Sequence, residues 1–362
     1  MAKVIKVQGA GGSPDGAAIE EAAAIIRSGG LVGFPTETVY GLAADALNRT
    51  AVARVFEVKA RPLDSALILH LAGADEAPRY VRAIPAVARD LMRDFWPGPL
   101  TIILPRAELV PEITAGGRDN IAMRVPDHPV ARDLIRACGT ALVGPSANKS
   151  GRPSPITAED VLAELDADIE AVLDAGPAPL GMESTVLDLT SSPPAILRPG
   201  SVTLEQLSPY LGPLVLKGGG VAPEAARAGP AGPRLVLADA APGDEGARLA
   251  WSLALRELAR GRRTGLLLTE EGVRFGRRLL GETGHAGAAG AAEDDTWPPG
   301  LVVASLGPSG DLRVPASRLY PALRLLERAG CDLIVAEPLP LHGLGLAIMN
   351  RLQKAASEVL RA

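Results

Sequence analysis

The chain has 362 residues, of which 47% are hydrophobic and 22% are charged. This composition is typical of a folded globular protein and excludes a wholly disordered chain, and the length favours two domains. The net charge is −5, and residues 1–210 hold 19 basic against 26 acidic side chains, so the balance argues against a protein that binds by neutralising many phosphates.

The first 210 residues alternate short apolar runs with amphipathic stretches. The expected strands are Val4–Val7, Leu31–Phe34, Ala66–Leu71, Leu100–Leu104, Ile121–Val125, Ala141–Gly144, Val186–Leu189 and Ala195–Leu197. The expected helices cover about residues 14–28, 50–60, 84–94 and 129–137. Asn48 or Thr50 is the expected N-cap of the second, and Thr157 is the expected N-cap of a further helix. This mixed order predicts an α/β domain with a twisted, partly antiparallel sheet.

Residues 211–233 are rich in Gly, Ala and Pro and are interpreted as a linker. Beyond the linker, the expected strands are Leu235–Ala238, Thr264–Leu268, Leu301–Ser305 and Asp332–Ala336, and the expected helices are about 244–260, 270–280, 315–329 and 345–361. Apolar runs alternating with helices predict a smaller, Rossmann-like parallel domain over residues 234–362. Residues 282–300 are expected to form a surface loop.

Cysteine and histidine are scarce, with two and four copies, and no pair has the spacing of zinc ligands. We therefore expect no structural zinc. The N-terminal segment has no apolar signal region, and no apolar run approaches 18 residues. The expectation is a cytoplasmic protein that does not enter the membrane.

Known nucleotide-binding motifs are incomplete in this chain. Residues 144–150 (GPSANKS) lack the glycine that a Walker loop places before its Lys-Ser pair, and residues 343–348 (GLGLAI) lack the third glycine of a dinucleotide fingerprint. No G-x-S-x-G elbow occurs either. The second domain is therefore expected to have a Rossmann shape without the usual nucleotide chemistry.

Polar residues gather instead in five short segments of the first domain, each at a strand end or in a loop. These are residues 35–42 (PTETVYGL), 59–62 (KARP), 124–126 (RVP), 145–148 (PSAN) and 183–186 (ESTV). Open α/β sheets build their ligand sites from such positions. The five segments are therefore expected to form one site.

Two cations, Lys59 and Arg61, stand directly before Pro62. Proline disfavours the helical conformation at the residue before it, so the chain leaves the helix there and both side chains could enter one cleft. Lys and Arg together suit a phosphate chain. An ordinary solvated helix end remains the alternative. Thr36 and Thr38 could likewise bind a polar ligand or cap local structure.

The other polar positions also allow two interpretations. Ser146 and Asn148 could hydrogen-bond a ligand or build a turn. His70 lies in an apolar strand, where a core histidine is the ordinary case. Arg124 ends another apolar strand, and Arg198 follows one; a buried arginine needs an anion, which either a protein carboxylate or a ligand could supply.

Taken together, the motifs resemble those of the YrdC-like family of threonylcarbamoyl-AMP synthases. The resemblance covers about residues 15–210 and rests on the segments PTETVYGL, K-x-R-P, W-P-G-P-L-T, R-V-P-D-H-P, P-S-A-N-x-S-G-R-P-S, E-S-T-V and L-R-P-G. Residues 336–338 (AEP) and 343–352 (GLGLAIMNRL) are similar to the second domain of the long form of these enzymes.

The resemblance implies a condensation of L-threonine with bicarbonate or carbon dioxide and ATP, which gives threonylcarbamoyl-adenylate and pyrophosphate. It also implies that the product feeds tRNA modification through a separate complex that transfers the threonylcarbamoyl group. Magnesium is expected to be held mainly by the ATP phosphates. No side-chain nucleophile is needed, so catalysis rests on positioning and on stabilising phosphate charge.

The resemblance also implies roles for individual residues. Lys59 and Arg61 are expected to be catalytic and to meet the ATP phosphates, and the other expected ATP contacts are Ser65, Asn120, Ser146, Asn148, Ser154 and Arg198. The family typically has threonine where Asn120 stands. The expected L-threonine pocket consists of Thr38, His70, Arg124, the backbone at Gly144, and Ser184. Arg124 would hold the threonine carboxylate.

One feature departs from the family pattern. In the long form, the linker usually carries a Pro-Gly-Met stretch followed by Tyr and His-Tyr residues and folds over the active site, but residues 211–233 contain no Tyr, His or Met. Two other functions are considered. A structured-RNA-binding module without turnover would need a basic face. A module of a larger maturation enzyme is disfavoured because Cys clusters and an acylphosphatase-like segment are absent.

Overall fold

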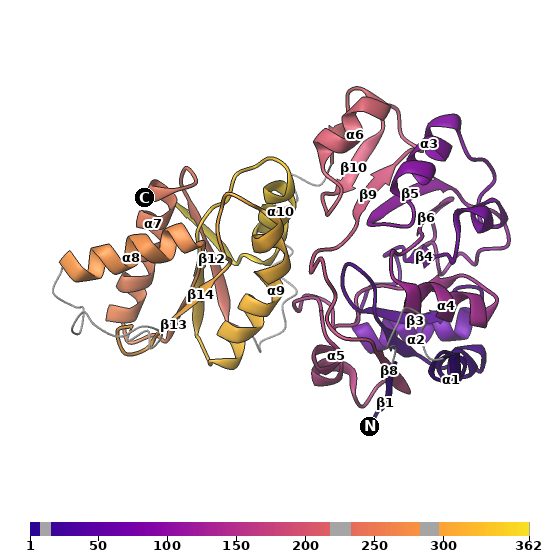
Figure 1. Ribbon diagram of the computed structural model, residues 1–362, viewed down its shortest axis with the longest axis horizontal. Coiled ribbons are helices and arrows are strands. Elements are labelled where there is room, and N and C mark those ends of the chain that lie inside the picture. The colour runs from indigo at the N-terminus through magenta and orange to yellow at the C-terminus, as the bar shows by residue number, and fades with distance from the viewer. Residues whose placement is uncertain (8–15, 218–232, 283–296, 362) are drawn as a thin grey trace. The chain divides into compact units, whose positions relative to one another are not determined.

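The computed structural model describes residues 1–7, 16–217, 233–282 and 297–361. The chain divides into two compact units, Met1–Gly218 and Gly219–Ala362, which are labelled by element in Figure 1. Most of the expected linker and most of the expected 282–300 loop lie outside the described residues. Each unit is an α/β structure, as the sequence predicts.

The described part of the first unit is built on an 11-stranded mixed sheet. Its strands follow the order β1 (Lys3–Lys6), β8 (Ala171–Asp174), β2 (Val32–Phe34), β3 (Gly41–Asp45), β7 (Leu142–Val143), β4 (Ile68–His70), β6 (Asn120–Arg124), β5 (Leu100–Pro105), β9 (Thr185–Asp188), β10 (Ala195–Arg198) and β11 (Val215–Leu216). Half of the strand pairs are antiparallel, including β2 with β3 and β5 with β6. The predicted partly antiparallel sheet is thus confirmed.

Helices cover both faces of this sheet. Helices α1 (Gly16–Arg27) and α4 (Pro129–Cys138) pack with one core cluster, while α2 (Arg49–Lys59), α3 (Ala86–Phe95) and α5 (Ala158–Leu165) pack with the other. Strand β3 shows the division, because Ala43 belongs to the first cluster and its neighbours Leu42 and Ala44 to the second. Alternate strand residues point to opposite faces, so β3 is buried on both sides. A 3₁₀ helix (Ala74–Arg79) and α6 (Leu204–Leu211) complete the unit.

Local sequence signals set two of the helix ends. Asn48 caps α2 and accepts hydrogen bonds from the backbone of Thr50 and Ala51, and Thr157 caps α5 by accepting from the backbone of Asp160. Thr157 is the cap that the sequence predicts, and Asn48 is one of its two candidates for the cap of α2. Helix α2 ends because Ala60 adopts the left-handed conformation with φ of 50°, and the chain turns sharply after Lys59.

The second unit has a parallel five-stranded sheet within its described residues. Its strand order is β14 (Leu301–Ser305), β13 (Thr264–Leu268), β15 (Leu333–Ala336), β12 (Arg234–Asp239) and β16 (Glu358–Arg361). All of these neighbours pair in parallel. Helices α7 (Asp244–Ala259) and α8 (Glu270–Glu282) pack together, as do α9 (Arg313–Arg328) and α10 (Leu344–Ala355). The Rossmann-like parallel arrangement is confirmed.

Several elements differ from the expectations. The last helix was expected to run to residue 361, but α10 ends at Ala355 and the chain continues as β16. The reason is tertiary: the backbone and hydroxyl of Ser357 both donate to the carbonyl of Leu235, which docks the segment on β12. Strands β3 and β8 and helix α6 were not anticipated, and β11 lies inside the segment interpreted as linker.

None of the described helices is both long and apolar enough to cross a membrane.

Candidate active site

A cavity of about 90 Å³ opens where several strands of the first unit end. It is lined by Thr38, Val39, Arg61, Ala66, Leu67, Ile68, His70, Arg124, Gly144, Pro145, Ser146, Glu183, Ser184 and Arg198. Eight of the residues predicted from the sequence are in this lining. All five polar segments therefore contribute residues to one cavity. The K-x-R segment contributes Arg61 but not Lys59.

Backbone pairing brings these distant segments together. Strands β4 and β6 run in parallel with His70 opposite Arg124. The loop after β7 joins the segment before β3, because Ala147 donates its backbone N–H to the carbonyl of Tyr40 at 2.9 Å and Ser146 pairs with Gly41. The site is thus attached to central strands of the sheet, and its lining residues are held by a rigid scaffold.

Arg124 is the centre of a buried polar network. Its Nη1 donates to Oε1 of Glu37 at 2.9 Å, its Nη2 donates to the hydroxyl of Thr38 at 2.9 Å, and its Nε donates to Nε2 of His70 at 3.0 Å. The side chains of Arg124 and Glu37 are only 5% and 6% exposed. The sequence allowed either a protein carboxylate or a ligand as the anion beside Arg124, and the structure shows the carboxylate of Glu37 in that place.

His70 is held neutral in this network. Burial, followed by the nearby Arg124 charge, lowers the pKa of His70 well below its usual 6.5. Because Nε2 accepts from Arg124, the ring proton sits on Nδ1, which lies 3.3 Å from the carbonyl oxygen of Ile68. The ring also packs edge-on against Phe34. A Cβ at Gly144 would lie 2.6 Å from this ring, so only glycine fits there.

A second group of polar contacts surrounds Ser184. Its hydroxyl lies 2.8 Å from that of Thr101 and accepts from Nη2 of Arg198 at 2.9 Å. Arg198 also donates to the backbone carbonyl of Ser184. A Cβ at Gly200 would lie 2.4 Å from the carbonyl of Glu183. The L-R-P-G turn therefore packs its glycine against the E-S-T-V segment and sets Arg198 across Ser184.

Lys59 is not among the residues that line the cavity. The side chain is buried, and its Nζ donates to the backbone carbonyls of Ser146 and Asn148. Burial, and then repulsion from Arg61, lowers the pKa of Lys59 to about 7. The left-handed Ala60 separates the two cations, so that Arg61 reaches the cavity lining while Lys59 braces the P-S-A-N loop.

Comparison with known proteins identifies the family. A sequence model described as "Telomere recombination" matches residues 24–200, and one described as "Threonylcarbamoyl-AMP synthase, C-terminal domain" matches residues 234–357. The chain is 38% identical to a threonylcarbamoyl-AMP synthase of Pyrococcus abyssi over 93% of its length and 94% of that protein's, and 40% identical to that of Bacillus subtilis over 93% and 92%.

The chain belongs to the threonylcarbamoyl-AMP synthase family. The solved structure of P. abyssi Sua5 complexed with L-threonine matches it with a TM-score of 0.84 and 35% identity, covering 99% of both chains. The relationship therefore extends over both units.

The remaining predicted residues of this synthase-family site lie outside the cavity lining. Asn148 donates its side-chain amide to the carbonyls of Lys149 and Arg152, which is the turn-building arrangement. Ser154 donates to Oε1 of Glu183 at 2.7 Å. Asn120 begins β6, at the opposite end of that strand from Arg124, and donates to the hydroxyl of Thr190 at 3.4 Å. Ser65 makes a backbone turn to Pro62.

Sequence reasoning missed Glu37, Thr101 and Glu183 as members of the site. All three stand inside segments that carry the family resemblance, but no role was assigned to them. A signal for Glu37 was present, because Arg124 in an apolar strand required an anion and Glu37 stands between two threonines in a segment flanked by apolar residues. For Thr101 and Glu183 the sequence gave no comparable indication.

Proposed function

We propose that this chain makes L-threonylcarbamoyl-adenylate from L-threonine, bicarbonate or carbon dioxide, and ATP, with release of pyrophosphate. The observation that carries the proposal is the convergence of the hydroxyl-rich Arg124 network and the cations Arg61 and Arg198 on one cavity. The chain is also related over 93% of its length to threonylcarbamoyl-AMP synthases.

The proposed threonine subsite consists of Thr38, His70, Arg124, the Gly144 backbone and Ser184. Arg124 is already paired with the Glu37 carboxylate. Its Nη1 and Nη2 atoms each carry two N–H bonds, however, and Nη1 uses only one of its two for Glu37. A threonine carboxylate can therefore join the network without displacing Glu37. The hydroxyls of Thr38 and Ser184 add polar partners for the threonine side chain, and His70 keeps the Arg124 guanidinium in position.

The proposed ATP subsite consists of Lys59, Arg61 and Arg198, with Ser65, Asn120, Ser146, Asn148 and Ser154 as further contacts. The Lys59 ammonium has three N–H donors, of which two are taken by loop carbonyls. The third remains for a phosphate oxygen. Magnesium is assigned to the ATP phosphates, where it would neutralise charge together with the two arginines.

The proposed chemistry needs no covalent enzyme intermediate. The threonine amine attacks the carbon of carbon dioxide and loses a proton, or attacks bicarbonate with loss of water, and forms a carbamate. A carbamate oxygen then attacks the α-phosphorus of ATP, and pyrophosphate leaves. The cations would stabilise the charge that develops on the phosphates, and the two subsites would hold the reacting atoms close together. Transfer of the product to tRNA by a separate complex, and a cytoplasmic location, stay predictions from the family resemblance.

The test is incorporation of radiolabelled bicarbonate into an adenylate, measured together with pyrophosphate release. We expect both to require threonine, with serine and valine as comparison substrates and valine strongly rejected. Arg61→Ala and Lys59→Ala should lower turnover by about 100-fold or more, as expected when groups that stabilise transition-state charge are removed. The matched control is Arg82→Ala, an arginine paired with Asp119 on the surface. Near-wild-type turnover in both site variants would contradict the assignment.

A further inference from the structure

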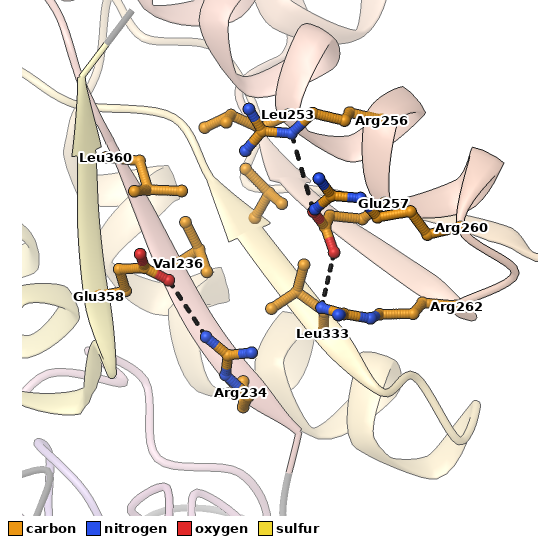
Figure 2. Close-up of a pocket in the computed structure, with 11 residues that line it drawn as sticks. Arg234, Val236, Leu253, Arg256, Glu257, Arg260, Arg262, Leu333, Glu358 and Leu360 are labelled. Atoms are coloured by element: carbon orange, nitrogen blue, oxygen red, sulfur yellow. Dashed lines mark hydrogen bonds and ion pairs between the residues drawn. The ribbon is translucent and has the colours of Figure 1, made fainter.

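The second unit has a cavity of about 230 Å³ that the proposed synthesis does not use. It lies between α7 and one face of β15, β12 and β16, and its lining residues are shown in Figure 2. We call it the arginine pocket. It is lined by Arg234, Val236, Leu253, Arg256, Glu257, Arg260, Arg262, Leu333, Val335, Glu358 and Leu360.

The floor of the arginine pocket is aliphatic. Alternate residues of the three parallel strands face it, with Val236 on β12, Leu333 and Val335 on β15, and Leu360 on β16, and Leu253 of α7 closes one side. Residues two apart on a strand share a face, so the strands present one continuous apolar surface. None of the lining residues is aromatic. The floor suits the carbon body of a small molecule.

The rim carries an uneven distribution of charge. Arg260 Nη1 donates to Oε1 of Glu257 at 2.5 Å, Arg262 Nη1 lies 2.6 Å from Oε2, and Arg256 Nε lies 3.7 Å from Oε1. The Glu257 side chain is only 8% exposed, while these arginines are 57%, 43% and 53% exposed. Three guanidinium groups thus converge on one buried carboxylate, as Figure 2 shows for two of them.

The second pair on the rim is balanced, because Arg234 donates to Glu358 at 3.1 Å. The arginine pocket as a whole therefore has four positive and two negative side chains. The three guanidinium groups around Glu257 contact it through one nitrogen each, which leaves N–H donors on each of them for a further anion. A network that served stability alone would be expected to balance its charges, because like charges held close together repel.

We propose that the arginine pocket binds an organic phosphomonoester. A phosphomonoester carries a charge of about −1.5 to −2 at neutral pH, which matches the surplus on the rim, and arginine forks bind phosphate oxygens in pairs. The carbon body packs on the aliphatic floor. A carboxylate would leave one positive charge uncompensated, and inorganic phosphate would leave the floor uncovered. A single-stranded RNA is disfavoured because the pocket offers no aromatic side chain for base stacking.

The test is isothermal titration calorimetry with AMP on the full-length chain carrying Arg61→Ala, a substitution expected from the proposed function to weaken nucleotide binding in the first unit. One binding event is expected in the second unit. Ribose 5-phosphate, which lacks the base, should bind about tenfold more weakly, and adenosine, which lacks the phosphate, should not bind measurably. Hydrogen exchange should show protection of peptides spanning residues 256–262 when AMP is added.

Variants locate the site. Adding Arg260→Gln and Arg262→Gln should weaken AMP binding at least tenfold, the loss expected for one charge-assisted hydrogen bond. Arg260→Lys with Arg262→Lys keeps the positive charges but not the two-pronged guanidinium groups, and should therefore recover part of the lost AMP affinity. The matched control is Arg313→Gln on α9, an exposed arginine paired with Asp311. Thermal unfolding checks that each variant is folded.

Two outcomes would overturn the proposal. In the first, AMP does not bind the Arg61→Ala chain, or it binds with an affinity that the two glutamine substitutions do not change, and hydrogen exchange shows no protection at residues 256–262. The other is binding of a long RNA that these substitutions weaken while AMP and inorganic phosphate do not bind, which would make the arginines part of a nucleic-acid surface.

Discussion

Replacement of Glu37 by glutamine tests whether the Arg124 network depends on a buried counter-charge. The substitution keeps the shape of the side chain and an oxygen that can accept from Arg124, but it removes the negative charge. Arg124 would then stay buried beside a neutral His70 and two threonine hydroxyls. Burial lowers the pKa of Arg124, and the Glu37 carboxylate opposes that effect, so the variant loses the main group that favours the charged form.

The expected loss of unfolding free energy is about 3–5 kcal/mol, the range found when one partner of a buried ion pair is removed. The 5% and 6% exposures of the two side chains place this pair in the buried class. The double variant Glu37→Gln with Arg124→Met removes both charges and should recover most of the loss. The exposed pair of Arg82 and Asp119 is the control, since Asp119→Asn at 73% exposure should leave the free energy of unfolding nearly unchanged.

The assay is denaturant-dependent hydrogen exchange of peptides from β5 and β6, which reports on the first unit separately from the second. The reasoning is refuted if Glu37→Gln lies within about 1 kcal/mol of wild type, or if the double variant is no more stable than the single one. The first result would mean that the hydroxyls and His70 satisfy Arg124 without a counter-charge, and the second would mean that the unpaired charge of Arg124 is not what destabilises the variant.

Three further predictions concern other sites. Lys59 has a pKa of about 7 and is mostly neutral at pH 8. Binding of ATP phosphates should raise this pKa, so that the protein takes up close to one proton when ATP binds. Calorimetry in buffers of different ionisation enthalpy measures this proton uptake, and Lys59→Met should abolish it. Burial raises the pKa of Glu337 from 4.5 to about 7, so its contribution to stability is complete below pH 4.5 and is lost as the pH rises through 7. Glu337→Gln should therefore stabilise the second unit at pH 8 by up to about 3 kcal/mol without effect near pH 4, and an equal gain at both pH values would argue against this titration. Thr157→Ala should cost about 1 kcal/mol through loss of the α5 cap, whereas Thr157→Ser should be nearly neutral in urea unfolding.

Local sequence signals predicted the features that depend on neighbouring residues. The caps at Asn48 and Thr157 and most of the strands follow from hydrophobic pattern and capping chemistry. Strand β16 could not be found in this way, because Ser357 leaves the helix to bond Leu235, which is 122 residues away. Short strands such as β8 and β11 owe their conformation to sheet partners and give little signal of their own.

In the candidate site too, some features could be predicted from neighbouring residues and others depend on residues that are distant in the sequence. The need of Arg124 for an anion could be read from its apolar strand, but its partner Glu37 lies 87 residues away and only the fold selects it. The K-x-R motif indicated two cations for one cleft. The left-handed backbone at Ala60, which sends Lys59 to loop carbonyls and Arg61 to the cavity, is a tertiary outcome that the sequence does not reveal.

The pairing of β11 with β10 has a practical consequence for dissecting the two units. A fragment cut after Tyr210 would lose the end of α6 and all of β11, and would leave β10, the strand that carries Arg198, as a bare sheet edge. Unprotected edges promote aggregation. A fragment that retains Lys217, whose backbone N–H donates to the carbonyl of Ile196, keeps this edge covered and is the better starting point for expressing the first unit in isolation.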